Sequence, residues 1–353
     1  MSNSRQLERD SETSIVMNRN ECESVRRERM SLHQAQSTSE PRPGTGIALP
    51  AGIVASSVTP FSADGSICLS QIGPHVEWLL AEGVNGLSPL GSSGEFVALE
   101  VIERERVLDE VLRVNHGRVP VWAGTHHYST RTTMELSRHA EAAGADALLI
   151  VPPYYMSSTA VQTMDHYRRI KDAVSIPIIL YHNIPLTNVD LRTADLVQLA
   201  KEGVIGGVKM SNAEPDRICQ LLQQAPADLR VYCGIDSVAF EGLCHGAHGW
   251  ISGILSIVPR AAQQLYQAIA RGNLPKARAL WKPLADLMRF QFSAYSNRGA
   301  GAHWFSTMKA TLNLIGPPVG DPLPPLAPLE PIYRGELIEI LARIGYQPRA
   351  EAT

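Results

Sequence analysis

The sequence predicts a (β/α)8 barrel, or TIM barrel, followed by a C-terminal helical region. From Gly52 onward, a short apolar run, a turn, an amphipathic helix and a closing glycine recur eight times. A spacing of about 20 to 35 residues between runs fits right-handed βα units. The apolar runs lie at 53–58, 84–90, 119–123, 146–151, 176–181, 204–209, 229–233 and 248–252.

An open, doubly wound sheet is the competing fold, because it is built from the same units. No G-x-G-x-x-G motif follows the first run, and eight regular units fit closure into a barrel better. After about residue 272 only helical periodicity remains, enough for about three helices and interrupted by a proline-rich segment. We therefore expect the barrel over residues 49–272 and the helical region over residues 273–353.

Residues 1–48 are rich in Arg, Glu, Ser and Gln and end in EPRPGTG before the first apolar run. Such a segment cannot bury enough apolar surface to fold, so we expect a disordered N-terminal tail. Its seven arginines and seven acidic residues argue against a transit peptide, and it lacks the apolar stretch of a signal peptide. A cytoplasmic location is the expectation.

The composition favours a small-molecule partner. The 353 residues are 44% hydrophobic and carry a net charge of −3, with acids and bases well mixed. Nothing in this pattern supplies the basic field that nucleic acid requires, and no apolar run is long enough to span a membrane. The five scattered cysteines form no C-x-x-C pair, which is typical of reduced thiols.

Two neighbouring strands of the predicted barrel end on reactive side chains, Tyr181 and Lys209, and a helix over TADLVQLAKEG joins them. The carboxyl ends of barrel strands open on one side, so the two side chains should face each other across a pocket. A desolvated lysine amine attacks carbonyls, and a phenol can transfer the protons that imine formation needs. In the alternative reading, Lys209 reaches solvent and Tyr181 is an ordinary core aromatic. These two residues alone do not decide between the readings.

Polar groups also follow two other strands. Ser92 and Ser93 lie between glycines just before a predicted helix, where hydroxyls and free backbone N–H groups can bind a carboxylate. An ordinary tight turn is the alternative there. The fourth strand ends in Pro152-Pro153-Tyr154-Tyr155, which places another phenol at the same rim.

Together, the segments GSSGE, PPYY, LYHNIP and GVKM resemble the dihydrodipicolinate synthase and N-acetylneuraminate lyase family. Ser92 lies 89 residues before Tyr181, and Tyr155 lies 26 residues before it. Lys209 follows Tyr181 by 28 residues, and these separations match the family pattern without gaps. The resemblance extends over roughly residues 50–345.

The resemblance implies a catalytic set of Lys209, Tyr181, Tyr155 and Ser92. Lys209 would form an imine with pyruvate or a related 2-oxo acid, and Tyr181 would relay protons. Ser92 and Ser93 would bind the substrate carboxylate, with Ser92 linking to the tyrosines. The covalent imine would serve as the electron sink, so we expect neither a cofactor nor a metal.

The resemblance also implies an oligomer and a pocket lining. Tyr155 resembles the residue that family members insert into a neighbouring subunit's site, so a homodimer or homotetramer is expected. Gly234 and Ile251 match pocket-lining positions. Leu186 stands at a substrate-binding position where lysine-pathway synthases carry an arginine, and Ser237 replaces the glutamate of sialic-acid lyases.

We therefore predict a Schiff-base lyase whose specificity differs from both named enzymes. Aldol cleavage or condensation, or dehydration, of 2-keto-3-deoxy sugar acids or 4-hydroxy-2-oxo acids is the leading activity. The alternatives are 4-hydroxy-tetrahydrodipicolinate synthase itself, and a non-catalytic barrel that binds a 2-oxo acid. A metal-dependent hydrolase is a third possibility, because five histidines lie at strand ends. Their spacing, however, is not typical of a metal site. These histidines are His126, His127, His182, His245 and His248.

Overall fold

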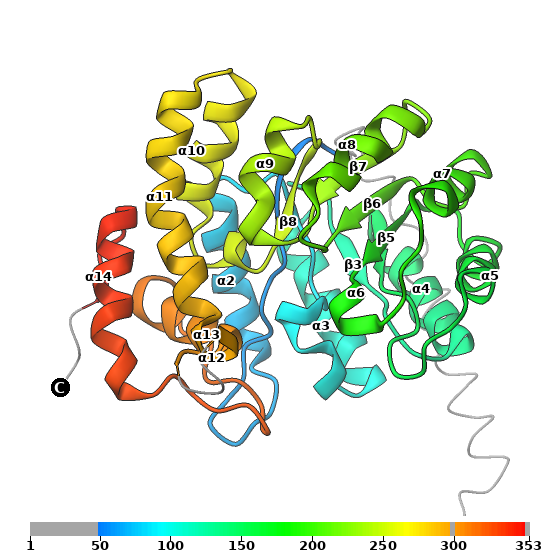
Figure 1. The fold of residues 1–353 in the computed structure, drawn as a ribbon. Coiled ribbons are helices and arrows are strands. Elements are labelled where there is room, and N and C mark those ends of the chain that lie inside the picture. Colours follow the sequence, from blue (N-terminus) through cyan, green and yellow to red (C-terminus); the bar gives the residue numbers. More distant parts are fainter. Residues whose placement is uncertain (1–48, 297–300, 350–353) are drawn as a thin grey trace, which may run out of the picture. The chain divides into compact units, whose positions relative to one another are not determined.

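The computed structural model describes residues 49–296 and 301–349, and the predicted N-terminal tail lies outside them. Eight parallel strands form one sheet in the order β2-β1-β8-β7-β6-β5-β4-β3 (Figure 1). A parallel bridge between Leu87 and Val121 joins β2 to β3, so the sheet closes. The predicted (β/α)8 barrel is confirmed. The strands are β1 (Gly52–Ala55), β2 (Gly86–Leu87), β3 (Trp122–Gly124), β4 (Ala147–Ile150), β5 (Ile178–His182), β6 (Gly207–Met210), β7 (Arg230–Cys233) and β8 (Gly249–Ser252).

Helices surround the strands on the outside of the barrel (Figure 1). Local signals fix their ends: Thr159 and Gln162 form a capping box at the start of α5, and Gly144 closes α4 with a φ of 93°. The outer helices are α2 (Leu69–Ala81), α3 (Val101–Asn115), α4 (Thr130–Ala143), α5 (Ala160–Lys171), α7 (Thr193–Lys201), α8 (Pro215–Gln224), α9 (Ala239–Cys244) and α10 (Pro259–Ala270). Short helices at the strand ends are η1 (Ser92–Gly94), η2 (Phe96–Ala98), α6 (Ile184–Thr187), η3 (Asp236–Val238) and η4 (Ile254–Ser256).

Alternation along each strand separates two apolar layers. In β4, Leu148 and Ile150 pack outward against the helices, whereas Leu149 faces the barrel interior. The interior layer includes Trp122, Tyr181 and Tyr232. The rings of Trp122 and Tyr232 pack edge to face, with their centroids 5.0 Å apart. Because this layer fills the barrel, the space for a substrate lies above it, at the carboxyl ends of the strands.

The C-terminal helices pack beside α10 and extend to the carboxyl end of the barrel (Figure 1). Helices α11 and α13 place four side chains over the strand ends, namely Gln291, Phe292, Trp304 and Met308. The C-terminal elements are α11 (Leu274–Gln291), α12 (Ser293–Ser296), α13 (Trp304–Ile315), η5 (Pro331–Tyr333) and α14 (Arg334–Ile344).

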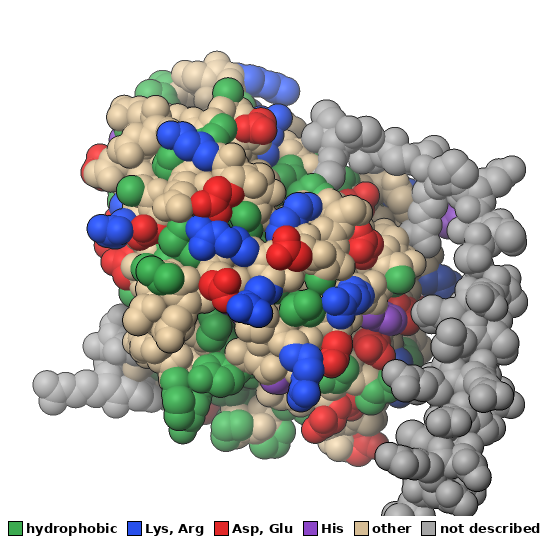
Figure 2. Space-filling model, turned by 90° about the vertical axis from the view of Figure 1, so that its right-hand side faces the viewer, with side chains coloured by type: hydrophobic (Ala, Val, Ile, Leu, Met, Phe, Trp, Pro, Cys, Tyr) green, Lys and Arg blue, Asp and Glu red, His purple; other side chains and the backbone are tan. Residues whose placement is uncertain are grey.

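The surface has no single-sign field on the face drawn in Figure 2, where acidic and basic side chains are interspersed. Arg168 and Glu202 form one such pair between α5 and α7, with N and O atoms 2.8 Å apart. Within the described part of the chain, no helix has the length and apolar character needed to cross a membrane.

Candidate active site

A cavity of about 280 Å³ opens at the carboxyl ends of the barrel strands. Ser56, Tyr181, Lys209, Gly234 and Ser252 line it from the ends of β1, β5, β6, β7 and β8. Ser92 and Ser93 line it from the loop after β2. The cavity therefore collects polar side chains from five of the eight strand ends, which is where barrel active sites form.

Tyr181 and Lys209 are direct neighbours in the parallel pairing of β5 with β6. Both side chains are buried, and the Lys209 Nζ lies 3.8 Å from the centroid of the Tyr181 ring. The strand register that places Tyr181 inside the barrel thus places Lys209 beside it. The juxtaposition expected from the sequence is present.

The Tyr181 phenol is more acidic than an ordinary tyrosine. Burial raises its pKa, but the charge of Lys209 and hydrogen bonding with Ser92, Asn183 and Lys209 outweigh burial and lower the pKa. A phenol of lowered pKa gives up its proton more readily. Tyr181 is therefore suited to transfer protons to and from a molecule that is bound at Lys209.

Gly234 permits the close packing around Lys209. A Cβ atom at Gly234 would lie 2.1 Å from Ser211 Oγ and 2.7 Å from Lys209 Cγ. Only glycine fits these contacts. A side chain at this position would displace Lys209, which explains why a glycine follows β7.

The loop that carries Ser92 and Ser93 is anchored on both sides. The Thr59 hydroxyl donates to the Gly94 carbonyl at 2.8 Å. Glu95 has a left-handed φ of 55°, and its buried carboxylate lies 3.4 Å from the Lys309 ammonium of α13. The loop is therefore clamped between β1 and the C-terminal helices, which holds the serine pair at the cavity.

Asp236 is an acidic side chain of the cavity that sequence analysis did not single out. Burial raises its pKa to about 6, although hydrogen bonds with Ser252 and Trp250 and the charge of Lys209 act in the opposite direction. Trp250 Nε1 donates to Asp236 Oδ1 at 3.0 Å. Asp236 is thus held in place within the electrostatic reach of Lys209.

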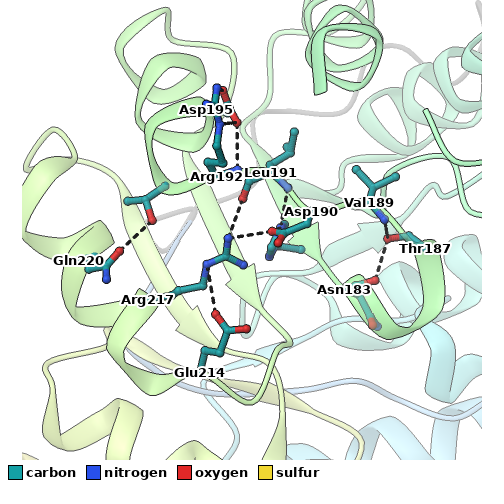
Figure 3. Close-up of polar contacts among 12 residues, drawn as sticks. Asn183, Thr187, Val189, Asp190, Leu191, Arg192, Asp195, Glu214, Arg217 and Gln220 are labelled. Carbon is teal, nitrogen blue, oxygen red and sulfur yellow. Dashed lines mark hydrogen bonds and ion pairs between the residues drawn. The ribbon is translucent and has the colours of Figure 1, made fainter. Parts of the chain in front are cut away.

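Helix α6 forms one rim of the cavity and carries Leu186, which is 57% exposed. Thr187 fastens its ends, because the Thr187 hydroxyl donates to the Asn183 carbonyl at 2.7 Å and accepts from the Val189 amide at 3.3 Å. Behind this turn, Arg217 bonds to Asp190 at 2.8 Å (Figure 3). The rim is therefore rigid, and it presents an apolar side chain at the mouth of the cavity.

Two predicted site residues lie elsewhere. Tyr155 is 82% exposed and does not line the cavity of its own chain. Ile251 is fully buried in the interior layer below, where it packs in the same cluster as Tyr181. Leu186, Ser92, Ser93 and Gly234 are brought together with Lys209 and Tyr181.

Residues from the C-terminal helices complete the cavity, and sequence analysis did not identify them. Gln291, Phe292, Trp304 and Met308 line its outer part. Helical periodicity predicted their helices, but a helix pattern does not tell where the helix packs. Ser56 and Ser211 could have been identified, because Ser56 lies within the first apolar run and Ser211 follows the sixth by two residues, both at the same rim.

A model of the dihydrodipicolinate synthetase family matches residues 49–344 of the chain. The chain belongs to this family. One relative is the 4-hydroxy-tetrahydrodipicolinate synthase of Anaeromyxobacter dehalogenans, which is 34% identical over 295 residues. The aligned region covers 83% of this chain and 97% of the relative.

Solved structures of the dihydrodipicolinate synthetase family have the same fold. The synthase from Aquifex aeolicus has a TM-score of 0.78 at 26% identity, with 85% of this chain and 100% of that chain covered. The synthase from Acinetobacter baumannii, solved in complex with pyruvate, has a TM-score of 0.75 at 31% identity, with 84% and 99% covered. Family members are lyases, and the chain is accordingly an enzyme of the class I aldolase type.

Two of the histidines at the strand ends of this dihydrodipicolinate synthetase family member, His126 and His182, have structural partners. His182 Nε2 accepts from the Leu191 amide at 3.1 Å, and burial lowers the pKa of His182 to about 4, so it is neutral at pH 7. His126 Nδ1 accepts from the Val151 amide at 3.0 Å. Among the residues that the structure describes, no three His, Cys, Asp or Glu side chains are placed to hold a metal ion.

Proposed function

We propose that the chain is a Schiff-base lyase that acts on pyruvate or a related 2-oxo acid through an imine on Lys209. The observation that carries the proposal is the buried Lys209 Nζ, 3.8 Å from the ring centroid of Tyr181 in a cavity that also contains Ser92 and Ser93. The amine would attack the 2-oxo carbon, and the Tyr181 phenol would protonate the departing oxygen as water. The hydroxyls of Ser92 and Ser93 would bind the carboxylate.

The imine would then serve as the electron sink of the reaction. When C3 loses a proton, the positively charged imine nitrogen takes up the electron pair, so a neutral enamine forms more readily than a free enolate would. The enamine carbon can add to an aldehyde, and the reverse sequence cleaves a 4-hydroxy-2-oxo acid. Water finally releases the 2-oxo acid from Lys209. The chemistry requires no further cofactor, and a pure binding protein would have no use for the phenol of lowered pKa.

The substrate class is the finer part of the proposal. Sugar-derived 2-keto-3-deoxy acids and 4-hydroxy-2-oxo acids fit a site that has Leu186, rather than a cation, on its rim. The names of the relatives favour a second candidate, 4-hydroxy-tetrahydrodipicolinate synthase. Aspartate semialdehyde, the aldehyde that a synthase condenses with pyruvate, carries a carboxylate, so an assay with that aldehyde distinguishes the two candidates.

Reduction with borohydride tests the imine directly. We expect pyruvate and borohydride to add one reduced adduct per chain, and peptide mapping to locate it on Lys209, because only an imine is trapped in this way. Lys309 is a matched internal control: it is equally buried, but Glu95 lies against its ammonium and it does not line the cavity. An adduct on Lys309, or no adduct, would contradict the mechanism.

The position of Tyr155 supports a shared active site. Its side chain is exposed and remote from the cavity of its own chain, as expected for a residue that completes the site of a second subunit. We expect a mixture of inactive Tyr155→Phe and Lys209→Ala subunits to regain activity, because a hybrid dimer contains one intact site.

Tyr154 provides the control for this complementation. It is half-buried against Phe96 of its own chain, with ring centroids 5.8 Å apart. A mixture of Tyr154→Phe and Lys209→Ala subunits should therefore show no gain beyond the activity of Tyr154→Phe alone. If hybrids of the Tyr155 pair form and stay inactive, Tyr155 does not act across subunits.

A further inference from the structure

We infer that the second substrate is a neutral aryl aldehyde, so that the enzyme makes or cleaves 4-aryl-4-hydroxy-2-oxo acids. This inference rests on the proposed function, in which Lys209 holds pyruvate as an imine. It goes beyond that function because it concerns the part of the cavity that pyruvate leaves open.

Among the described residues, the charges of the cavity disfavour an anionic second substrate. Among the described residues that line it, Lys209 is the only basic side chain and Asp236 the only acidic one. Lys209 is consumed by the imine, and Asp236 repels an anion. A second carboxylate would therefore lie in a partly dry site without a cation, which is unfavourable.

Apart from Gln291, the side chains that line the outer part of the cavity are apolar or aromatic. Leu186 is 57% exposed and Phe292 is 40% exposed at the rim. The Phe292 ring lies nearly parallel to that of Trp304, at an interplanar angle of 15° and with centroids 6.2 Å apart. Aromatic faces held in this way bind another ring by offset stacking or edge contacts. A planar apolar group bound between Leu186 and Phe292 would cover both side chains.

The space beyond the cavity is large enough for a ring. A second hollow of about 620 Å³ shares Ile235, Asp236 and Phe292 with the cavity and continues along α11 past Trp281. Arg289 also borders this hollow, but its guanidinium forms an ion pair with Asp286 of the same helix. The extension is thus not an open anion site.

The carboxyl group of Asp236 suits a hydroxyl near the reacting carbon. Asp236 lies within electrostatic reach of Lys209, and Ser252 and Trp250 already hold its carboxyl group. In an imine on Lys209, Asp236 would then lie toward C4 of the substrate, and Leu186 and Phe292 would lie toward its outer end. Hydroxyls of a longer chain that reached Leu186 and Phe292 would lose hydrogen bonds to water there, whereas an aryl ring would not.

The reaction balances without another reactant. C3 of the pyruvate enamine attacks the aldehyde carbon, so one C–C bond forms. C3 has given up one proton, and the aldehyde oxygen takes up one proton. Water then hydrolyses the imine, which restores the 2-oxo group and the Lys209 amine. Pyruvate and benzaldehyde therefore yield 4-hydroxy-4-phenyl-2-oxobutanoate, and the reverse reaction regenerates both.

Three aldehydes test the inference on the full-length enzyme: benzaldehyde, neutral D-glyceraldehyde and anionic aspartate semialdehyde, each with pyruvate. We expect the kcat/KM for benzaldehyde to exceed both others at least about 10-fold, the size of effect that one well-packed ring provides. Cleavage of 4-hydroxy-4-phenyl-2-oxobutanoate, followed through pyruvate release, checks the reverse direction. A preference for either of the other aldehydes overturns the inference.

Variants separate ring recognition from general damage. Phe292→Ala should lower the ratio of kcat/KM for benzaldehyde to that for D-glyceraldehyde about 10-fold. Ile332→Ala removes an exposed apolar side chain of η5, 76% exposed and outside the cavity, and should leave the ratio unchanged. Leu186→Arg should raise the relative rate with aspartate semialdehyde, because it supplies the missing cation. An unchanged ratio in Phe292→Ala contradicts the inference.

Borohydride trapping with pyruvate alone distinguishes the two levels of failure. If the adduct forms on Lys209 and no aryl preference is found, the inference is wrong and the proposed function stands. If no adduct forms, the proposed function is wrong, and the inference is wrong with it.

Discussion

Lys209→Ala is expected to abolish turnover, and Tyr181→Phe to lower kcat by about 10² to 10⁴, the share of a positioned acid-base group. The difference arises because Lys209 supplies the bond to the substrate, whereas Tyr181 supplies protons that water can deliver slowly. Tyr181→Phe keeps the ring that packs inside the barrel and removes only the hydroxyl. The fold should therefore persist, which circular dichroism and thermal unfolding would check.

Tyr232 is the matched control for Tyr181. It is another buried tyrosine of the interior layer, but its hydroxyl donates to the Pro50 carbonyl at 2.9 Å and it does not line the cavity. Tyr232→Phe should lower the free energy of unfolding by about 1 kcal/mol through the lost hydrogen bond and leave kcat nearly unchanged. Equal kcat values for Tyr181→Phe and the native enzyme would remove Tyr181 from the mechanism.

The pH profile gives an independent readout of the same residue. Tyr181 acts as an acid only while protonated, and its pKa lies below the ordinary tyrosine value of about 10, because Lys209 and its hydrogen-bonding partners outweigh the effect of burial. Activity should therefore decline with rising pH before an ordinary tyrosine would titrate. In Tyr181→Phe this alkaline decline should disappear from the residual activity.

The catalytic centre was predictable because neighbouring strands carry it. Repeated βα units predicted the barrel, and in a barrel the order of strands fixes which strand ends adjoin, so Tyr181 and Lys209 could be paired from the sequence. Tyr155 could be assigned only through the family resemblance, because its place depends on a second subunit. Periodicity contains no information about contacts between chains.

The outer part of the site could not be predicted from the sequence, because it depends on long-range packing. Helices α11 and α13 show clear periodicity, but nothing local indicates that Phe292 and Trp304 line the same cavity as Leu186. Glu95 is the clearest case. It lies close to the serine pair in the sequence, but its carboxylate accepts from the Leu323 amide, 228 residues away in the chain.

Replacement of Lys309 is expected to have the largest effect on stability. Its ammonium and the Glu95 carboxylate are 1% and 3% exposed and lie 3.4 Å apart, and Lys309 also donates to the Thr59 and Val319 carbonyls. Burial lowers the pKa of Lys309 to about 8, and burial likewise raises the pKa of Glu95 against the attraction of Lys309. Each charge is thus stable in this site only because the other is present.

Lys309→Met would leave the Glu95 carboxylate buried without a counterion. Removal of one partner of a buried ion pair lowers the free energy of unfolding by about 3 to 5 kcal/mol. Glu95→Gln combined with Lys309→Met removes both charges and should recover a large part of that loss, because paired apolar or neutral replacements are often nearly neutral. Urea unfolding of the two variants measures the difference. An equal decrease in the free energy of unfolding in the single and the double variant would show that the packing of Lys309, rather than its charge, matters.

An exposed pair provides the comparison for this buried one. Arg113 and Glu110 lie 2.7 Å apart on α3, with the Arg113 side chain 70% exposed, so Arg113→Met should cost less than about 1 kcal/mol. Because Glu95 follows Ser92 and Ser93 in one clamped loop, Lys309→Met should also raise the KM for pyruvate in the fraction that remains folded, while Arg113→Met should not. A destabilisation of Lys309→Met no larger than that of Arg113→Met would mean that the clamp does not hold the carboxylate-binding loop.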